Sequence, residues 1–587
     1  MTFLKARLPD YMMPSGFVFL ERMPFLPNGK VDRGALALLG ERARRGSSPI
    51  AEPRSEIETL IAGVWRQVLK VEAIGIDDNF FELGGHSLMA AEVAARLRDA
   101  FGRPVTVRDL FDSPTVAGLA RAIESMIQGE AEEDLPPMQP VARKRQPPLS
   151  LAQEPLFVFS QLFGGGDFLN MPYAYRLDGA LNLIALRRAV QEIVGRHATL
   201  RTGFVDSAKG PKQFVRRRAT IKLPVVDLGR LPEPQREIKL EQMSKQDAAQ
   251  PFDLERPPLL RIKLLRLAQT EHILLVTTHH MISDQWSMGV FRRELATLYE
   301  AFSRGLLSPL PELPVQFADF ACWQRQSLKN GFFQRQTSYW LKQLGGPATP
   351  LDLRRGGKNK KAVRFHSSRR PIEINDQLFA AVKALAREQN CTPFMIFVAA
   401  LSILLHRFSG MSDIRIGTLA ANRGQPGTEG LIGYFVNALV LRARIRPRMS
   451  FADVISHVRA ASVAAYAHQD LPFEHLEALL ERKHGKHAPL YQVMLNYRNQ
   501  TTPTLEANGL TIASWNGKQR AEDPGIGISR LDVNLHLREL ATKLTGAVNY
   551  KTDLFDDAAM AKFLESYTGI LEQIVAHPGR RISERTG

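Results

Sequence analysis

The sequence predicts a multidomain chain in which a small all-α bundle of about four helices precedes a larger, two-lobed α/β region. The 587 residues allow two to four domains at about 150 residues per domain. Apolar residues recur at helical spacing over residues 54–128, whereas strand-like and helix-like stretches alternate over residues 148–587. Because one core rarely holds more than about 250–300 residues, we expect an N-lobe (148–320) and a C-lobe (321–587).

The first 147 residues divide into three segments. Residues 1–45 are too few for a stable core of their own, and Asn28-Gly29 predicts a turn between extended segments. Residues 54–128 predict helices on either side of the loop DDNFFELGGHS. Residues 129–147 are acidic, then proline-rich, then basic, and their lack of apolar periodicity predicts a linker.

The α/β region shows its elements most clearly where apolar runs alternate with amphipathic stretches. HILLVTTHH (272–280) predicts a strand, and MGVFRRELATLYEAF (288–302) predicts the helix after it. Two further strands are predicted at DIRIGTLAA (413–421) and ALVLRARI (438–445). The longest apolar stretch, Phe394 to Leu405, is shorter than the roughly 20 residues of a membrane span, so we expect a buried helix and no membrane partner.

Composition and charge exclude several classes of protein. Apolar residues make up 44% and charged residues 23%, which excludes a mainly disordered or collagen-like chain. Two cysteines, Cys322 and Cys391, cannot form a disulfide framework or a cysteine-rich zinc site, so we expect a reducing, cytoplasmic setting. No apolar signal-peptide region follows the N-terminus.

The net charge of +17 makes nucleic-acid binding a hypothesis to be weighed. The basic residues are spread over the whole chain, however. The densest cluster, Arg354 to Arg370, contains one aromatic residue, Phe365, and stands beside no zinc-finger or helix-turn-helix signature. We therefore expect a solvated loop there and no nucleic-acid partner.

Ser87 follows Gly84-Gly85-His86 and is predicted to open a helix. The glycines permit a tight, exposed turn, and the free N–H groups of a helix N-terminus favour a phosphate group. The same pattern is also typical of an ordinary N-cap serine, which local physics alone favours.

The stretch DNFFELGGHSLMAAEVAARL (78–97) resembles the carrier-protein (thiolation) motif of nonribosomal peptide synthetases, and the resemblance extends over residues 54–128. It implies that Ser87 carries 4'-phosphopantetheine through a phosphodiester, and that a phosphopantetheinyl transferase is a partner. His86 is similar to the residue found in carriers that feed condensation domains. LPDYMMPSGFVFLERMPFLPNGKVDR resembles the last motif of an adenylation domain, with Lys30 matching its catalytic lysine. Residues 1–45 are thus expected to be the remnant of such a domain.

His279 and His280 end an apolar strand, on which adjacent side chains point to opposite faces. One histidine should face a cavity while the other packs, and the pair cannot chelate a single metal ion. A third ligand at zinc-like spacing is absent from the sequence, so we expect no metal site. Two structural histidines at a strand end remain the alternative at this point.

HHMISDQWS (279–287) resembles the HHxxxDG motif of condensation domains, which share the fold of chloramphenicol acetyltransferase. Further stretches resemble the other motifs of that family, in family order, over about 148–587: LSLAQEPLF, RHATLRTGF, FADFACWQ, IGYFVNALVLR, HQDLPFEHL and PLYQVMLNY.

The resemblance assigns roles residue by residue. His280 matches the active-site histidine, and Asp284 matches an aspartate that pairs with an arginine, for which Arg423 is the candidate. A buried carboxylate is costly without a partner. His279 is expected to pack or to fix the tautomer of the active-site ring.

The sequence also departs from the family pattern. Gln285 replaces the usual glycine, and Pro155 replaces an arginine of the first motif. We expect Gln285 and Ser287 to line the substrate tunnel. These departures suggest a specialised condensation domain that acts on a modified or dehydrated residue.

The resemblance implies a carrier–condensation pair. The donor acyl or peptidyl thioester on Ser87 would be attacked by the amine of an aminoacyl group on a downstream carrier, and upstream synthetase modules would supply the donor. Besides the specialised subclass, the sequence leaves open an epimerisation domain, which shares the histidine motif, and a non-catalytic module that recruits a partner enzyme.

Overall fold

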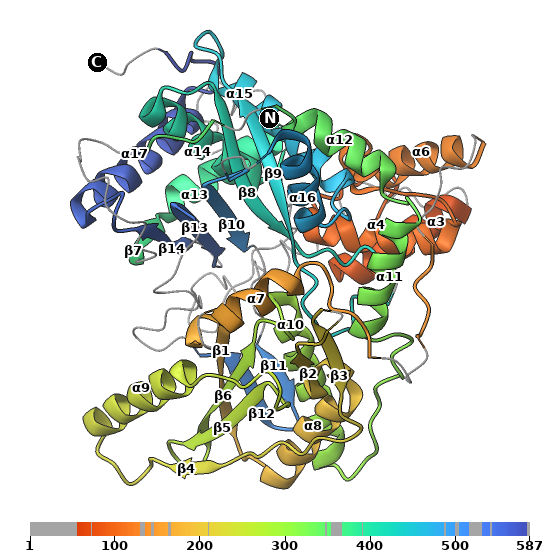
Figure 1. Cartoon of the computed structure of the whole chain (residues 1–587), viewed down its shortest axis with the longest axis vertical. Helices are drawn as coiled ribbons and strands as arrows, with labels where there is room; N and C mark the ends of the chain where they lie inside the picture. Colours follow the sequence, from red (N-terminus) through yellow and green to blue (C-terminus); the bar gives the residue numbers. More distant parts are fainter. Residues whose placement is uncertain are drawn as a thin grey trace, which may run out of the picture.

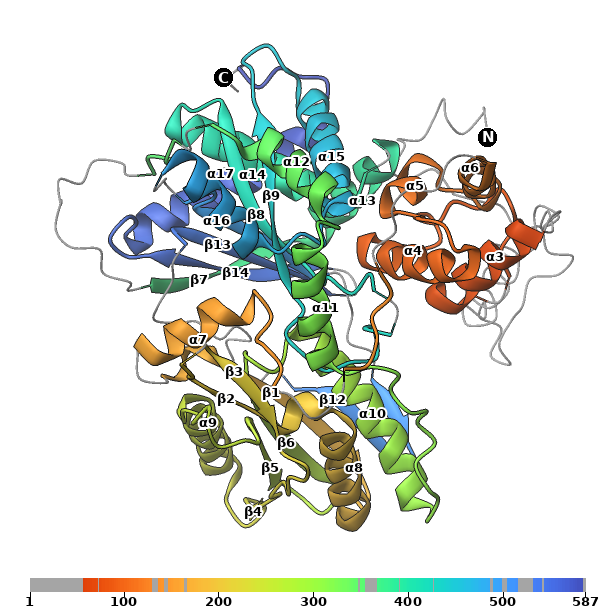
Figure 2. The same ribbon diagram turned by 45° about the vertical axis from the view of Figure 1, so that its right-hand side comes forward.

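A computed structural model gives the arrangement of the chain (Figures 1 and 2). It describes the following residues: 56–71, 73–128, 136–141, 146–162, 166–208, 210–346, 349–353, 367–389, 391–425, 427–485, 489–498, 504–515, 531–540 and 543–583. The expected adenylation remnant with Asn28 and Lys30, and residues 354–366 of the basic cluster, lie outside the described residues.

A helical bundle (56–128) forms the N-terminal part of what is described, in agreement with the helical spacing of its sequence. Its helices are α3 (Glu56–Leu69), α4 (Ser87–Phe101), α5 (Val107–Asp112) and α6 (Val116–Gln128). Trp65 is fully buried and packs edge-on against Phe80, with ring centroids 5.0 Å apart. Gly102 is the C-cap that follows α4, and glycine adopts its left-handed conformation (φ 59°) without strain.

The N-lobe is built on a six-stranded sheet in the order β11-β12-β1-β6-β5-β4. Its elements before residue 304 are α7 (Gln153–Leu162), β1 (Asn170–Gly179), α8 (Leu183–Arg196), β2 (Thr202–Val205), β3 (Lys212–Val215), β4 (Val225–Asp227), α9 (Glu233–Ala249), β5 (Leu260–Arg266), β6 (Glu271–His279) and α10 (Gln285–Ser303), with short 3-10 turns at Asp167–Leu169 and Ala198–Arg201. All pairs within the sheet are antiparallel except β4 with β5. The expected strand 272–280 and its following helix are thus confirmed as β6 and α10, with the strand ending one residue earlier.

The C-lobe is built on a second six-stranded sheet in the order β7-β14-β13-β10-β8-β9, in which β10 runs parallel to β13 and β8. The elements after residue 316 are α11 (Phe317–Lys329), α12 (Gln334–Leu344), β7 (Ser367–Ile374), α13 (Asp376–Glu388), α14 (Pro393–Ser409), β8 (Asp413–Ala420), β9 (Asn437–Arg444), α15 (Phe451–Ala467), α16 (Phe473–His484), β10 (Val493–Arg498), β11 (Leu505–Ala507), β12 (Leu510–Ser514), β13 (Val533–Glu539), β14 (Leu544–Lys551) and α17 (Asp557–Ala576).

Strands β11 and β12 lie in the C-terminal half of the sequence but belong to the N-lobe sheet, where β12 pairs with β1 (Tyr175 opposite Ser514). The expected division into 148–320 and 321–587 therefore misses two strands that the C-terminal region contributes to the N-lobe sheet. They tie the lobes together along β1, whose other edge pairs with β6, the strand that leads to His280.

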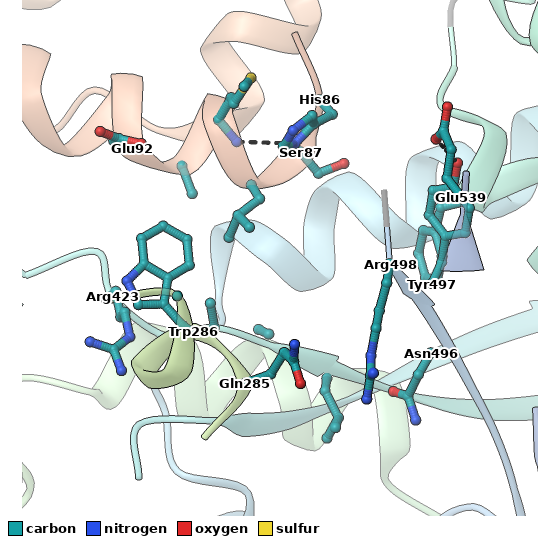
Figure 3. Close-up of a pocket in the computed structure, with 18 of the residues that line it drawn as sticks. His86, Ser87, Glu92, Gln285, Trp286, Arg423, Asn496, Tyr497, Arg498 and Glu539 are labelled. Atoms are coloured by element: carbon teal, nitrogen blue, oxygen red, sulfur yellow. Dashed lines mark hydrogen bonds between the residues drawn. The ribbon is translucent and has the colours of Figure 1, made fainter. Parts of the chain in front are cut away.

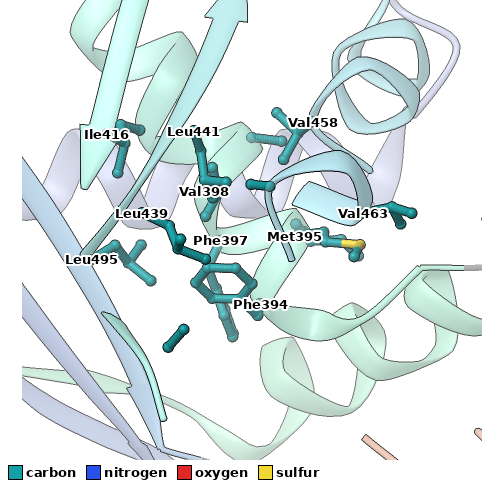
Figure 4. Close-up of a cluster of buried hydrophobic side chains, with 14 of the residues drawn as sticks. Phe394, Met395, Phe397, Val398, Ile416, Leu439, Leu441, Val458, Val463 and Leu495 are labelled. Carbon is teal, nitrogen blue, oxygen red and sulfur yellow. The ribbon is translucent and has the colours of Figure 1, made fainter. Parts of the chain in front are cut away.

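The core of the C-lobe surrounds α14, the expected buried helix (Figure 4). This helix is apolar on all sides because the sheet covers one face and α15 and α17 cover others. Its labelled contacts in Figure 4 come from β8, β9, β10 and α15. Within the described ranges, no helix is long and apolar enough to cross a membrane.

The helical bundle lies beside the C-lobe in both views, with α5 packed against α15 (Figures 1 and 2). The guanidinium of Arg98 on α4 donates to the carbonyl of Gly424 at 3.3 Å. Part of the linker is described as well: Trp323 Nε1 donates to the Pro136 carbonyl at 2.6 Å, and Val141 N donates to Asp319 at 2.8 Å. The linker therefore runs along α11 on its way to the N-lobe.

Candidate functional site

A cavity of about 1750 Å³ lies where the helical bundle, the N-lobe and the C-lobe meet. Ser87 lines it from the bundle, and His280 lines it from the end of β6. These two residues are 193 positions apart in sequence (280 − 87), and they were expected to carry out successive parts of one reaction. The structure brings them to the same cavity (Figure 3 shows the Ser87 end of it).

Ser87 is the first residue of α4, and it is not the N-cap. The cap is His86, whose Nδ1 accepts a hydrogen bond from Met89 N at 3.3 Å. Burial lowers the pKa of His86 to about 4, and a neutral ring is what this acceptor role requires. The alternative of an ordinary N-cap serine is therefore wrong, and the Ser87 hydroxyl is left to line the cavity.

The turn before Ser87 requires both of its glycines. Gly84 has φ 95°, a conformation that strains other residues. A Cβ on Gly85 would lie 2.4 Å from the ring of Phe80. A partly exposed hydroxyl on a tight turn at the start of a 15-residue helix fits an attached phosphopantetheine group, because the helix N-terminus stabilises the phosphate charge.

His280 is positioned by three contacts. Its backbone N donates to the Leu169 carbonyl at 2.8 Å, and its ring packs edge-on against Tyr434 with centroids 4.9 Å apart. Its Nδ1 lies 3.1 Å from the Ser283 carbonyl oxygen. Because a carbonyl oxygen can only accept, Nδ1 carries the proton, and the basic lone pair of the neutral ring is on Nε2.

His279 points away from the cavity, as expected for adjacent residues at a strand end. Its side chain is 1% exposed, its Nδ1 accepts from Met281 N at 3.2 Å, and its ring packs near Phe252. Burial lowers its pKa to about 3, so the ring is neutral. His279 thus belongs to the packing of the loop, and the expectation that it fixes the tautomer of His280 is not met, because Ser283 supplies that contact.

Asp284 and Arg423 form a buried ion pair between the lobes. The distance from Arg423 Nη2 to Asp284 Oδ1 is 3.0 Å, and the exposed fraction is 3% for the Arg423 side chain and 1% for the Asp284 side chain. Asp284 is also the N-cap of α10, and its Oδ2 accepts from Phe435 N at 3.1 Å. The other nitrogen of Arg423, Nη1, donates to the carbonyls of Thr428 and Leu431 at 2.6 and 2.7 Å.

Asp284 and Arg423 both line the cavity, and this network links them to Tyr434. Arg423 donates to the Leu431 carbonyl in the loop that leads to Tyr434, and Tyr434 contacts the ring of His280. Burial lowers the pKa of the Arg423 guanidinium, and Asp284 opposes this shift by favouring the charged form. We conclude that the pair holds the two lobes in register at the position of His280.

The two expected tunnel residues have different places. Gln285 lines the cavity and is exposed within it. Ser287 is fully buried and does not line the cavity, which corrects the expectation that it is a tunnel residue. Its hydroxyl lies 2.7 Å from Asp284 Oδ1, 3.0 Å from Arg423 Nη2, and 2.9 and 3.0 Å from the backbone O and N of Gly433.

Sequence reasoning missed several residues of the cavity wall. Trp286 donates from its indole to the Glu429 carbonyl at 2.9 Å, and Figure 3 shows its ring beneath the bundle helix. Tyr434 lies within the motif IGYFVNALVLR, which was matched as a whole without a role for this residue. Asn496 was likewise only part of PLYQVMLNY.

Charges face each other where the bundle meets the lobes. Burial lowers the pKa of Arg293 on α10, and Glu92 of the bundle and Glu294 oppose that shift. Burial also raises the pKa of the Glu429 carboxyl, and the neighbouring negative charge of Glu92 raises it further. Among the residues that the structure describes, no group of three or more His, Cys, Asp and Glu side chains could hold a metal ion.

Comparison with protein families gives two matches. Residues 143–586 match the family described as "Condensation domain", and residues 59–123 match the family described as "Phosphopantetheine attachment site". The second match contains Ser87 and its helix.

Curated relatives match nearly the whole chain. A protein of the linear gramicidin synthase from Brevibacillus parabrevis is 38% identical over 586 residues, which is 99% of this chain and 7% of that protein. "Malpibaldin synthetase" from Mortierella alpina is 34% identical over 583 residues, 99% of this chain and 10% of that protein. The chain therefore spans a small fraction of the length of these relatives.

Solved structures share the fold of the two lobes. The X-domain from teicoplanin biosynthesis is 27% identical, with a TM-score of 0.66, over 77% of this chain and 100% of that one. The first condensation domain of the calcium-dependent antibiotic (CDA) synthetase matches at a TM-score of 0.63 and 20% identity, over 76% of this chain and 99% of that one. The second likeness concerns the fold alone.

Proposed function

We propose a function for this chain on the premise that it belongs to the condensation-domain family of nonribosomal peptide synthetases. In this function, the chain joins a donor carried on Ser87 to the amine of an acceptor by an amide bond. The observation that carries the proposal is the shared cavity: Ser87 and His280 line one space within one chain. When attached to Ser87, phosphopantetheine supplies a thiol that holds the donor acyl group as a thioester.

His280 is the residue we propose for handling the proton. The acceptor amine has a reference pKa near 8, so roughly a tenth of it is already neutral at pH 7. A base therefore has limited work, and His280 would also orient the amine. Nε2 of His280 would take the proton as the C–N bond forms, and it would return that proton to the sulfur as the C–S bond breaks, so that protons balance.

Asp284 and Arg423 act through position in this scheme. Both line the cavity, but none of the contacts described above joins them to His280, and they hold α10 and the Tyr434 loop together. Tethering of both reactants supplies the effective concentration that a reaction of two free molecules lacks.

The order of the domains gives the direction of transfer in this proposal. The bundle precedes the two lobes in the chain, as a donor carrier precedes its condensation domain in the family that the chain resembles, so the bundle would present the donor. The acceptor would be carried by a downstream carrier domain, and the donor chain would come from upstream modules. A phosphopantetheinyl transferase would have to modify Ser87 first. Residues 1–45 would be the end of an adenylation domain, with Lys30 as its former catalytic lysine.

The experiment that tests this function is amide formation by the purified chain. Ser87 is converted to its phosphopantetheine form, loaded with a donor and mixed with a separately loaded acceptor carrier. We expect the acceptor carrier to gain the mass of the donor acyl group. The Ser87→Ala chain is the control and should give no product. A wild-type chain that is fully loaded, yet transfers nothing to any acceptor carrier, would contradict the proposal.

A second candidate is a module that recruits a partner enzyme. It is favoured by the 26% identity to the X-domain whose solved structure is a complex with OxyB. An intact buried ion pair and a histidine facing the cavity favour catalysis instead. Capture of a partner enzyme by a loaded chain that forms no amide would support recruitment. Formation of the amide with an added water loss would support the specialised subclass that Gln285 suggests.

A further inference from the structure

Gln285 projects a carboxamide into the cavity where the family pattern has no side chain. It is the first residue of α10, five positions after His280, and both residues line the same space. Figure 3 shows its side chain pointing into the cavity from the N-lobe side. A ligand in this cavity therefore has a carboxamide among the groups that surround it.

The orientation of this carboxamide is fixed by a neighbour. The hydroxyl of Tyr173 on β1 donates to Gln285 Oε1 at 3.2 Å. Tyr173 also lines the cavity, so the bond joins two lining residues, one from β1 and one from α10. Because the oxygen of the carboxamide is engaged by Tyr173, its amino group is the end offered to a ligand, and an amino group can only donate.

The facing wall of the cavity is also polar. Asn496 and Arg498 on β10 point into the same space from the C-lobe (Figure 3). Asn496 Nδ2 donates to Asn534 Oδ1 at 3.2 Å, and Asn534 is a further lining residue. Amide and guanidinium groups on both sides of the cavity favour a chain that carries carbonyl groups over a hydrocarbon chain, which would exclude water from these groups without offering them an acceptor.

We propose that the amino group of Gln285, oriented by Tyr173, donates a hydrogen bond to a carbonyl oxygen of the donor acyl chain, and that this contact selects peptidyl donors over hydrocarbon acyl donors. The inference rests on the proposed function, since it assigns a role toward the donor. Gln285 is the specificity determinant, and Tyr173 is a positioning residue that acts through it. A glycine at position 285 would offer no such donor.

The inference is tested by binding, so that no loaded chain and no reaction is needed. The full chain carries Ser87→Ala, which leaves the cavity free of a tethered arm. Two soluble probes of equal length are compared by calorimetry: a dipeptidyl-pantetheine amide and a straight-chain acyl-pantetheine amide. We expect the dipeptidyl probe to bind more tightly. Gln285→Leu should weaken its binding by about three- to tenfold, the range of one net hydrogen bond, and leave the hydrocarbon probe unchanged.

Two further variants separate hydrogen bonding from shape. Gln285→Glu keeps the length and one oxygen but has no N–H, so it should weaken the dipeptidyl probe as much as Gln285→Leu does. Tyr173→Phe removes only the orienting hydroxyl and should weaken it by a smaller factor in the same direction. Gln235→Leu on the exposed face of α9 is the matched control and should change neither probe.

The outcomes are separable. Equal affinity of the two probes for the Ser87→Ala chain, or unchanged affinity in both Gln285 variants, would overturn the inference. If the probes behave as expected and the loaded wild-type chain forms no amide, the proposed function fails while the binding role of Gln285 stands. If Gln285→Leu does not fold, Gln285→Glu and Tyr173→Phe give the same test.

Discussion

Replacing Arg423 by methionine should destabilise the two-lobed region strongly, because it leaves the Asp284 carboxylate buried without its partner. Methionine has nearly the length of the arginine stem and fills most of its volume, so the change removes chiefly the charge and the hydrogen bonds. Asp284 is 1% exposed and cannot be solvated in place. Breaking a buried pair in this way typically costs about 3–5 kcal/mol.

The structure supports the upper half of that range. Arg423 also donates to the carbonyls of Thr428 and Leu431, which the variant leaves without a donor. For a region of this size, 1 kcal/mol corresponds to about 2 °C in Tm, so we expect Tm to fall by about 8–10 °C in differential scanning calorimetry.

Two controls make the result specific. The exposed pair of Arg108 and Asp112, 3.1 Å apart, is solvated on both sides, and Arg108→Met should change the free energy of unfolding by less than about 0.5 kcal/mol. In the double variant Arg423→Met with Asp284→Asn, the uncompensated charge is gone, and at least half of the decrease in Tm caused by Arg423→Met should be recovered. A single Arg423→Met variant that melts within about 2 °C of the wild type would refute the argument, as would a double variant less stable than the single one.

Three other perturbations test separate contacts. Ser287→Ala removes the hydroxyl that bridges Asp284, Arg423 and Gly433, so chemical denaturation should show a loss of about 1–3 kcal/mol, and a loss below about 0.3 kcal/mol would mean that the bridge is dispensable. Arg293→Glu places a negative charge opposite Glu92 and should slow single-turnover amide formation about fivefold. Adding Glu92→Arg in a double variant should restore the rate, and the uncharged Arg293→Gln should have a smaller effect. Burial raises the pKa of Glu474 to about 7, so its protonated form stabilises the fold below pH 4.5 and this contribution is lost as the pH rises through 7. Glu474→Gln should therefore be more stable than the wild type at pH 8 by about 1–3 kcal/mol and equal to it at pH 4. An equal difference at both pH values would disprove a titrating role.

Local patterns predicted the elements well because each has a short-range cause. The strand before His280 and the buried helix α14 follow from runs of apolar residues whose length and flanks distinguish them. The opposite orientation of His279 and His280 follows from strand geometry and needs no knowledge of the partner elements. The demand that Asp284 have a cationic partner likewise follows from its expected burial.

The parts that could not be predicted depend on contacts between distant segments. Arg423 lies 139 positions from Asp284, and only the family resemblance singled it out among many arginines. Ser287 shares the motif of Gln285 but turns into the buried network, because residues two apart near a helix start point in different directions. The pairing of β12 with β1 requires an element to leave its own lobe, and no periodicity in Leu510–Ser514 signals that exchange.

The N-cap at His86 shows how a local interpretation can fail in a useful way. Serine is among the residues most common at helix starts, so Ser87 was expected to cap α4 on local grounds. The structure gives that task to His86, whose ring nitrogen accepts from Met89 N. A serine that is not needed for capping can carry a modification without weakening its helix.

The central claim is that one imidazole acts on a group delivered from Ser87 of the same chain. The most direct measurement is intact-mass detection of a labelled acyl group in single turnover, with wild-type and His280→Ala chains loaded to the same extent. We expect transfer of the label from the wild-type chain to the acceptor carrier, and a rate lower by about 10²–10⁴ in His280→Ala at an unchanged Tm. Equal transfer rates from the two chains would contradict it.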